Sequence, residues 1–200
     1  MIFQINFTKY PLSLNSSHKP KYDLIIRVNP GQSDLSHYNL ISGHQLPEQI
    51  VIGMVEAVSH SGSISKNPFN FQHFNCSEAS IVVNGVHEGH GSEPYKLNIS
   101  GGDYINLYSD FLLNTGIASE DRDFGIDIND YVGGNFLLVF DRSKDKCNRY
   151  HRHPADSGVI DINIRTKTNL TSTVVVIVYA TYSSEIYIDD QNNVTMLKTF

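Results

Sequence analysis

The stretch that most constrains the fold of this chain follows Leu46-Pro47 and ends before Ser61-Gly62-Ser63. Isoleucine, valine and methionine fill both the odd and the even positions between Ile50 and Val55, with Gly53 as the exception. Successive side chains of a strand point to opposite faces, so this strand is apolar on both sides. A strand of this kind has to be buried between two layers. The sequence therefore predicts a layered, strand-rich fold around it.

Similar apolar or alternating runs recur along the chain and predict further strands. Asn84-Gly85 is typical of a type I′ hairpin turn, so a short partner strand should begin at Val86. Residues 32–45 are polar with scattered apolar side chains and fit either a loop or a weak strand. The other predicted strands are 2–7, 22–28, 79–83, 135–140, 159–165, 173–182, 184–189 and 194–197, with 173–182 in the centre of a sheet.

Helical spacing is confined to two short segments. Apolar residues recur every three or four positions between Gly102 and Gly116, with Asp103 as the expected N-cap. A second helical turn is expected at 127–132, capped by Asp127 or Asn129. Many strands with so few helices predict an all-β protein, either an antiparallel β-sandwich or a jelly roll, with one or two short helices in loops. We expect residues 1–200 to form a single domain.

Charge and composition argue against several classes of function. The net charge is −6 and there is no block of lysine or arginine, so direct nucleic-acid binding is not expected. No apolar run is long enough for a membrane span, and the first residues lack the pattern of a signal peptide. Cys76 and Cys147 are expected as free thiols. Six Asn-x-Ser/Thr sequons are attributed to a composition rich in asparagine and serine.

Nine histidines raise the hypothesis of a cupin-like metal site, which would use histidines and a carboxylate from neighbouring strands. The histidines nearest to carboxylates lie in predicted loops instead, and we expect surface or interface roles for them. No nucleophile elbow, phosphate-binding loop or zinc-protease motif occurs. We therefore expect neither a cofactor nor enzymatic activity. The histidine groups are His87 and His90, near Glu88 and Glu93, and His151 and His153, near Asp156.

The order and spacing of several motifs resemble a family of virus-like proteins found in invertebrate genomes. That family in turn resembles the double-jelly-roll major capsid proteins of DNA viruses and mobile elements. The likeness covers roughly residues 46–195, although family members are about twice as long and only their C-terminal half is matched. The motifs are 46–47, 50–56, 62–63, 67–71, 73–74, 81–85, 115–116, 128–131, 133, 136–141, 174–180 and 185–189.

The resemblance implies a structural capsid protein of a DNA virus or virus-derived element. Such a protein would self-associate as a trimer or pentamer, contact other capsid proteins, assemble inside the host cell and reside in the virion. The chain would be either the second jelly roll of a longer protein or a jelly roll that stands alone. The alternative function is an attachment domain of the same fold that binds a receptor or a glycan.

Two sets of residues are the candidate contact sites. In the first, Phe69, Phe71 and Phe74 are expected to pack while Pro68 fixes a bend, which makes this cluster a loop anchor or an interface. In the second, tyrosine and histidine side chains in long loops are expected to be exposed for contact. The first set is Asn67, Pro68, Phe69, Asn70, Phe71 and Phe74; the second is His87, His90, Tyr95, Tyr150, His151 and His153.

Overall fold

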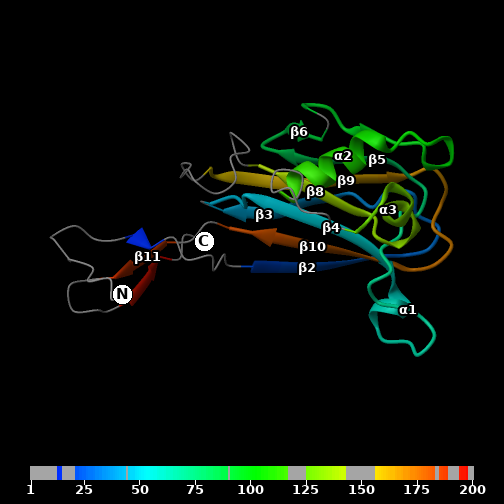
Figure 1. The fold of residues 1–200 in the computed structure, drawn as a ribbon, viewed down its shortest axis with the longest axis horizontal. Coiled ribbons are helices and arrows are strands. Elements are labelled where there is room, and N and C mark those ends of the chain that lie inside the picture. Colours follow the sequence, from blue (N-terminus) through cyan, green and yellow to red (C-terminus); the bar gives the residue numbers. More distant parts are fainter. Residues whose placement is uncertain are drawn as a thin grey trace.

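Two antiparallel sheets packed face to face form the body of the protein, seen here in a computed structural model (Figure 1). The structure describes residues 13–14, 21–43, 45–89, 91–116, 125–142, 156–182, 185–188 and 194–197. The first sheet contains, in order, β2 (Lys21–Val28), β10 (Val174–Thr181), β4 (Gln49–Glu56) and β8 (Leu137–Asp141). The second contains β3 (His37–Gly43), β9 (Gly158–Thr166), β5 (Cys76–Val83) and β6 (Val86–Glu88), and β7 (Tyr95–Lys96) also pairs with β5.

The strand pairs are nested, because the strands before the β5–β6 turn pair in reverse order with the strands after it. From the inside outwards, β5 pairs with β6, β4 with β8, β3 with β9 and β2 with β10, all antiparallel. The β5–β6 connection stays within one sheet, and each of the other connections between these eight strands crosses to the opposite sheet. This is the connectivity of a jelly roll, so the predicted fold class is confirmed.

The innermost turn of this nested arrangement is Asn84-Gly85, as predicted. Both residues have positive φ, 51° and 84°, and Val83 pairs directly with Val86, as a two-residue type I′ turn requires. The Asn84 side chain also reaches the start of β9. Its Oδ1 accepts from the Val159 amide at 2.9 Å, and its Nδ2 donates to the Ser157 carbonyl at 3.3 Å. The Asn84 side chain therefore links the β5–β6 turn to the start of β9 by hydrogen bonds.

The core lies between the sheets and is filled by one face of each strand. The central strand β10 is also apolar on its outer face, where Val175 is fully buried and Ile177 is half-buried. The same holds for β4, whose Val55 is buried on that side. The prediction that the strand through residues 50–55 is covered on both faces is therefore confirmed. The inner faces contribute Ile50, Ile52 and Met54 from β4, Ile160, Ile162 and Ile164 from β9, and Val174, Val176, Val178 and Ala180 from β10.

Cys76 at the start of β5 belongs to this core and carries a free thiol, as expected. Removal from water disfavours the thiolate, and this burial raises the pKa of Cys76 to about 12. The thiol therefore stays protonated and is a poor nucleophile in the folded protein. Cys147 lies outside the described residues.

Both predicted helices are present and lie beside the edge strand β8. The predicted N-cap Asp103 is wrong, because α2 (Ile105–Asn114) begins after Tyr104. Asp103 pairs instead with Asn98, and this pair encloses the 3₁₀ turn η1 (Ile99–Gly101). Asp127 caps α3 (Ile128–Gly134) in a capping box with Asp130, as one of the two predicted alternatives.

Two side chains from these helices occupy the free edge of β8. Asn114 donates from Nδ2 to the Val139 carbonyl at 2.7 Å, and the Tyr131 hydroxyl donates to the Leu137 carbonyl at 2.8 Å. An edge strand with open carbonyls would otherwise invite pairing with another chain. The helices therefore close this side of the first sheet.

Three parts of the chain refine the predicted strand pattern. The long apolar strand is shorter than expected, because β4 ends at Glu56 and residues from Ala57 form the short helix α1 (Ala57–His60). The Ala57 amide still donates to the Thr173 carbonyl, beside the start of β10, and the chain then leaves the sheet. Residues 32–45 contain β3, which settles the choice between loop and strand. The predicted strand at 2–7 lies outside the described residues.

A small third sheet is formed by β1 (Ser13–Leu14), β11 (Glu185–Ile188) and β12 (Val194–Leu197). The β11 and β12 strands correspond to the predicted strands 184–189 and 194–197, and they pair antiparallel with each other. Figure 1 shows this sheet beyond one end of the sandwich. None of the helices in the described part of the chain is long and apolar enough to cross a membrane.

We expect Asn84→Ala to lower the free energy of unfolding by about 1–2 kcal/mol, because it removes two hydrogen bonds and disfavours positive φ. Urea denaturation followed by circular dichroism measures this change. Asn169→Ala, at an exposed asparagine without positive φ, is the matched control and should be neutral. Equal midpoints for the two variants would contradict a stabilising role for the Asn84 side chain.

Candidate functional site

Residues 57–75, here called the 57–75 loop, contain the first set of candidate residues. The loop leaves the first sheet after β4 as α1, turns at Gly62, which has a φ of 93°, and returns to begin β5 at Cys76. In Figure 1, α1 and the turn after it project from the body of the sandwich. The loop therefore has a projecting part and a part that lies against the sheet.

Backbone hydrogen bonds fix the returning part of the loop between β4 and the segment that precedes β8. The Phe71 amide donates to the Gly134 carbonyl at 2.8 Å, and the Phe136 amide donates to the Phe71 carbonyl at 3.1 Å. One residue later, the Gln72 amide donates to the Met54 carbonyl at 2.9 Å. The base of the loop is thus hydrogen-bonded on both sides, to β4 and to residues 134–136.

The Phe71 ring lies over Gly53 of β4 on the outer face of the first sheet. A β-carbon at position 53 would come within 2.6 Å of this ring, so only glycine allows the contact. Phe71 packs there with Val55 and Val175, which form a small apolar cluster separate from the main core. This cluster is the second layer that the apolar outer face of β4 predicted.

Two asparagines shape the bend that contains Pro68. The Asn67 side chain accepts a hydrogen bond from the Phe69 amide at 2.9 Å, and the Asn67 carbonyl accepts from the Asn70 amide at 3.3 Å. Side-chain bonds of this kind are typical of asparagine in turns. The Asn70 side chain lies over Gly134, where a β-carbon would come within 2.6 Å of its Oδ1.

The last part of the loop is anchored by His73 and Phe74. Phe74 is half-buried against the main core and has positive φ, 43°, as does Asn75 at 55°. The His73 ring meets the edge of Phe136 with 6.0 Å between ring centroids, and its Nδ1 accepts from the Asn75 amide at 2.9 Å. Burial lowers the pKa of His73, in agreement with the neutral form that an accepting nitrogen requires.

Phe69 does not pack, and here the sequence prediction is wrong. Its side chain is 73% exposed, whereas Phe71 and Phe74 are half-buried as expected. The reason is the turn at 67–70, which places Phe69 at its outer corner before the chain returns to the sheet. Aromatic residues two positions apart therefore have opposite environments.

The second set of candidate residues is only partly described. His87 on β6 is half-buried, and its Nδ1 lies 3.0 Å from the Ser80 hydroxyl. Tyr95 was predicted to be exposed, but it is only 4% exposed, and its hydroxyl donates to the Asp110 carboxylate at 2.5 Å. Burial and this carboxylate raise the pKa of Tyr95. His90, Tyr150, His151 and His153 lie outside the described residues.

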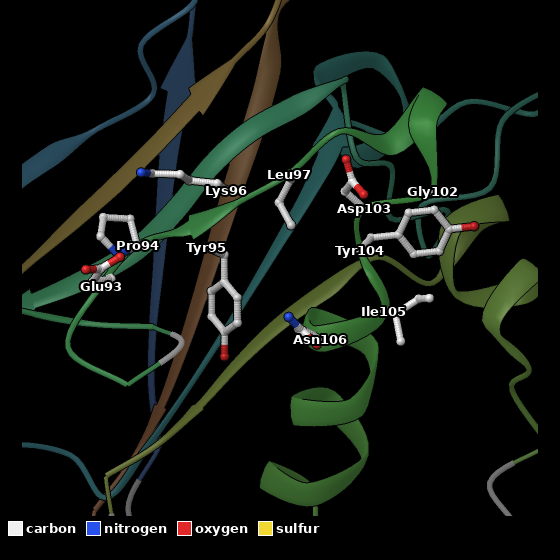
Figure 2. A pocket seen from close by; sticks show the side chains of 10 residues that line it. All are labelled: Glu93, Pro94, Tyr95, Lys96, Leu97, Gly102, Asp103, Tyr104, Ile105 and Asn106. Atoms are coloured by element: carbon white, nitrogen blue, oxygen red, sulfur yellow. The ribbon is translucent and has the colours of Figure 1, made fainter.

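An open hollow of about 490 Å³ lies between β7 and the first turn of α2. In Figure 2, the Tyr95 ring extends towards α2, and the carboxylates of Glu93 and Asp103 lie on opposite sides of the view. No group of three histidine, cysteine, aspartate or glutamate side chains could hold a metal ion in the part of the chain that the structure describes. The lining consists of Glu93, Pro94, Tyr95, Lys96, Leu97, Gly102, Asp103, Tyr104, Ile105 and Asn106.

Comparison with known proteins bears on the fold. No protein-family model matches the sequence, and no curated protein is similar to it. A chain in the cryo-EM structure of the Sputnik virophage matches 90% of this chain with a TM-score of 0.50 and 12% sequence identity. The chain shares its fold with a virophage protein. The likeness to viral proteins that the sequence indicated is therefore confirmed at the level of the fold.

The crystal structure of the mavirus major capsid protein is a second match, with a TM-score of 0.42, 10% identity and 96% of this chain covered. In both cases the matched part is a minor share of the other chain. This chain covers 39% of the Sputnik virophage chain and 41% of the mavirus protein.

We expect Gly53→Ala to destabilise the protein by about 1–3 kcal/mol, because the new methyl group collides with the Phe71 ring. Phe71→Leu should relieve the collision, so the double variant should be less destabilised than the sum of the two single variants. Urea denaturation of all four proteins completes the cycle. Strict additivity would contradict the contact between Phe71 and position 53.

We also expect His73 to make stability depend on pH. Folding lowers the pKa of His73 below the unfolded value of about 6.5. The contribution of this side chain to the free energy of unfolding is therefore complete above about pH 6.5 and is lost as the pH falls below that value. Between pH 7.5 and 5.0, wild type should lose more free energy of unfolding than His73→Asn, whose carbonyl accepts a hydrogen bond at either pH. The other eight histidines are common to both proteins, and equal losses would contradict this role.

Proposed function

We propose that this chain is a structural protein of a DNA virus or virus-derived element. Its jelly roll would stand in a protein shell and contact neighbouring subunits through loops and edges. The observation that supports this most is the fold itself, with nested strand pairs and a match to the Sputnik virophage chain over 90% of the residues. The motifs shared with virus-like proteins point in the same direction.

The low charge of the sequence supports contacts with protein rather than with nucleic acid. Only 18% of the residues are charged, the net charge is −6, and no two lysine or arginine residues are adjacent in the sequence. Nucleic-acid binding depends on basic residues that neutralise phosphates, whereas the cores of protein interfaces are poor in charge. Other capsid subunits are therefore the proposed partners, in the virion and during assembly inside the host cell.

The chain covers about two-fifths of the Sputnik virophage chain that it matches. Two arrangements fit the proposed function: a jelly roll joined to a second one in a longer protein, and a jelly roll that stands alone. In both, the first and last strands of the sandwich, β2 and β10, are neighbours, and Lys21 pairs with Thr181. The chain thus enters and leaves the sandwich at the same end.

A shell protein should self-associate, and we expect trimers, pentamers or larger assemblies of the purified chain. Light scattering coupled to size-exclusion chromatography over a range of concentrations, followed by electron microscopy, measures this. A protein that stays monomeric at every concentration would contradict the proposal. If that monomer were also retained on a glycan array, the hollow between β7 and α2 would be the first site to examine, and an attachment domain would replace the shell protein.

A further inference from the structure

We infer that the 57–75 loop is the surface through which one copy of this chain binds a second copy. Val58, Ile64 and Phe69 are its apolar contact residues. The inference rests on the proposed shell function and assigns the contact between subunits to one loop.

Exposed apolar side chains are concentrated in this loop. Eight large apolar side chains are mainly exposed in the described part of the chain, and three of them lie between positions 58 and 69. Val58 is 59% exposed, Phe69 is 73% exposed, and Ile64 is as open as in an extended peptide. Most of this apolar surface stays in water in a single copy, and its burial against a partner would release about 25 cal/mol for each Å².

Several polar side chains of the same loop line a small open hollow beside the end of β4. This hollow of about 210 Å³ is lined entirely by polar and charged residues. Val58, Ile64 and Phe69 are not among the residues that line this hollow, so it does not cover their side chains. The lining residues are Glu56, Ser59, Ser65, Lys66, Asn67, Asn70 and Gln72.

The loop is also fixed before any partner binds. Lys66 forms an ion pair with Glu56 at the end of β4, and a bridge between Ser63 and Lys66 closes the projecting turn. At the base of the loop, the Phe71 amide and carbonyl are hydrogen-bonded to Gly134 and Phe136, and the Gln72 amide is hydrogen-bonded to Met54 of β4. A preformed surface loses little conformational entropy on association, so more of the apolar burial contributes to affinity.

Charge favours a second copy of this chain as the partner that binds the 57–75 loop. The chain has 21 acidic residues and a net charge of −6, so two copies repel each other over most surfaces. The 57–75 loop contains no aspartate or glutamate, and Lys66 neutralises the Glu56 carboxylate at its base. Copies that meet through this loop bring apolar groups together and avoid pairs of like charges. A single lysine gives little attraction for nucleic acid or for an anionic membrane.

Two double variants with matched exposure test the inference. Val58→Ser with Phe69→Ser changes the loop, at side chains 59% and 73% exposed. Val86→Ser with Tyr38→Ser is the control, at side chains on β6 and β3 that are 59% and 71% exposed. The loop variant should raise the concentration for half-assembly at least about tenfold, because interface anchors each contribute about 1 kcal/mol or more. The control should assemble like wild type.

Circular dichroism and thermal melting check that both variants remain folded, which is expected because all four side chains are exposed. If folding were lost, Ile64→Asp, which places a carboxylate at the exposed tip of the loop, provides the same test. Wild type that assembles while the folded loop variant assembles equally well would overturn the inference and leave the shell function standing. Wild type that never assembles would overturn both the inference and the shell function. This conclusion would hold even if the protein bound lipid vesicles or another protein.

Discussion

The nested antiparallel pairing of the strands is the constraint on which the rest of this structure depends. It brings the first and last strands of the sandwich, β2 and β10, side by side and places β4 on the other side of β10. β4 and β10 also carry apolar side chains on their outer faces, where Val55 and Val175 are buried and Ile177 is half-buried. The second layer that they need is supplied by the 57–75 loop through Phe71. The base of that loop is therefore a consequence of the sheet order.

Much of the fold could be predicted because local signals and tertiary packing agree. In three places the local pattern and the packing favour the same element. These are the Asn84-Gly85 turn, the spacing of apolar residues in α2 and the β-branched run in β10. The end of β4 was missed for the opposite reason. Ala57 and Val58 continue the apolar run, but Ala57 covers the small outer cluster and Val58 faces solvent as the chain leaves the sheet.

The candidate site shows the same limit at the level of single side chains. Sequence composition singled out the aromatic residues after Pro68, but it could not separate Phe69 from Phe71. That distinction depends on Gly53, a distant residue without a side chain, which makes room for one ring only. Tyr95 lies in a loop-like sequence yet is buried, because α2 brings Asp110 to its hydroxyl. Each outcome is decided by a partner far along the chain.

The nested pairing also sets the order in which the protein can fold. The β5–β6 pair closes a loop of only two residues, whereas the β2–β10 pair has to bring together strands from nearly opposite ends of the sandwich sequence. Closing a longer loop costs more chain entropy, so pairing is easiest when each inner pair has already formed and shortens the next closure. The sheet would then grow outwards from Asn84-Gly85. On this route β10 and the apolar outer cluster form last, and the 57–75 loop becomes a fixed projection only when the jelly roll is complete.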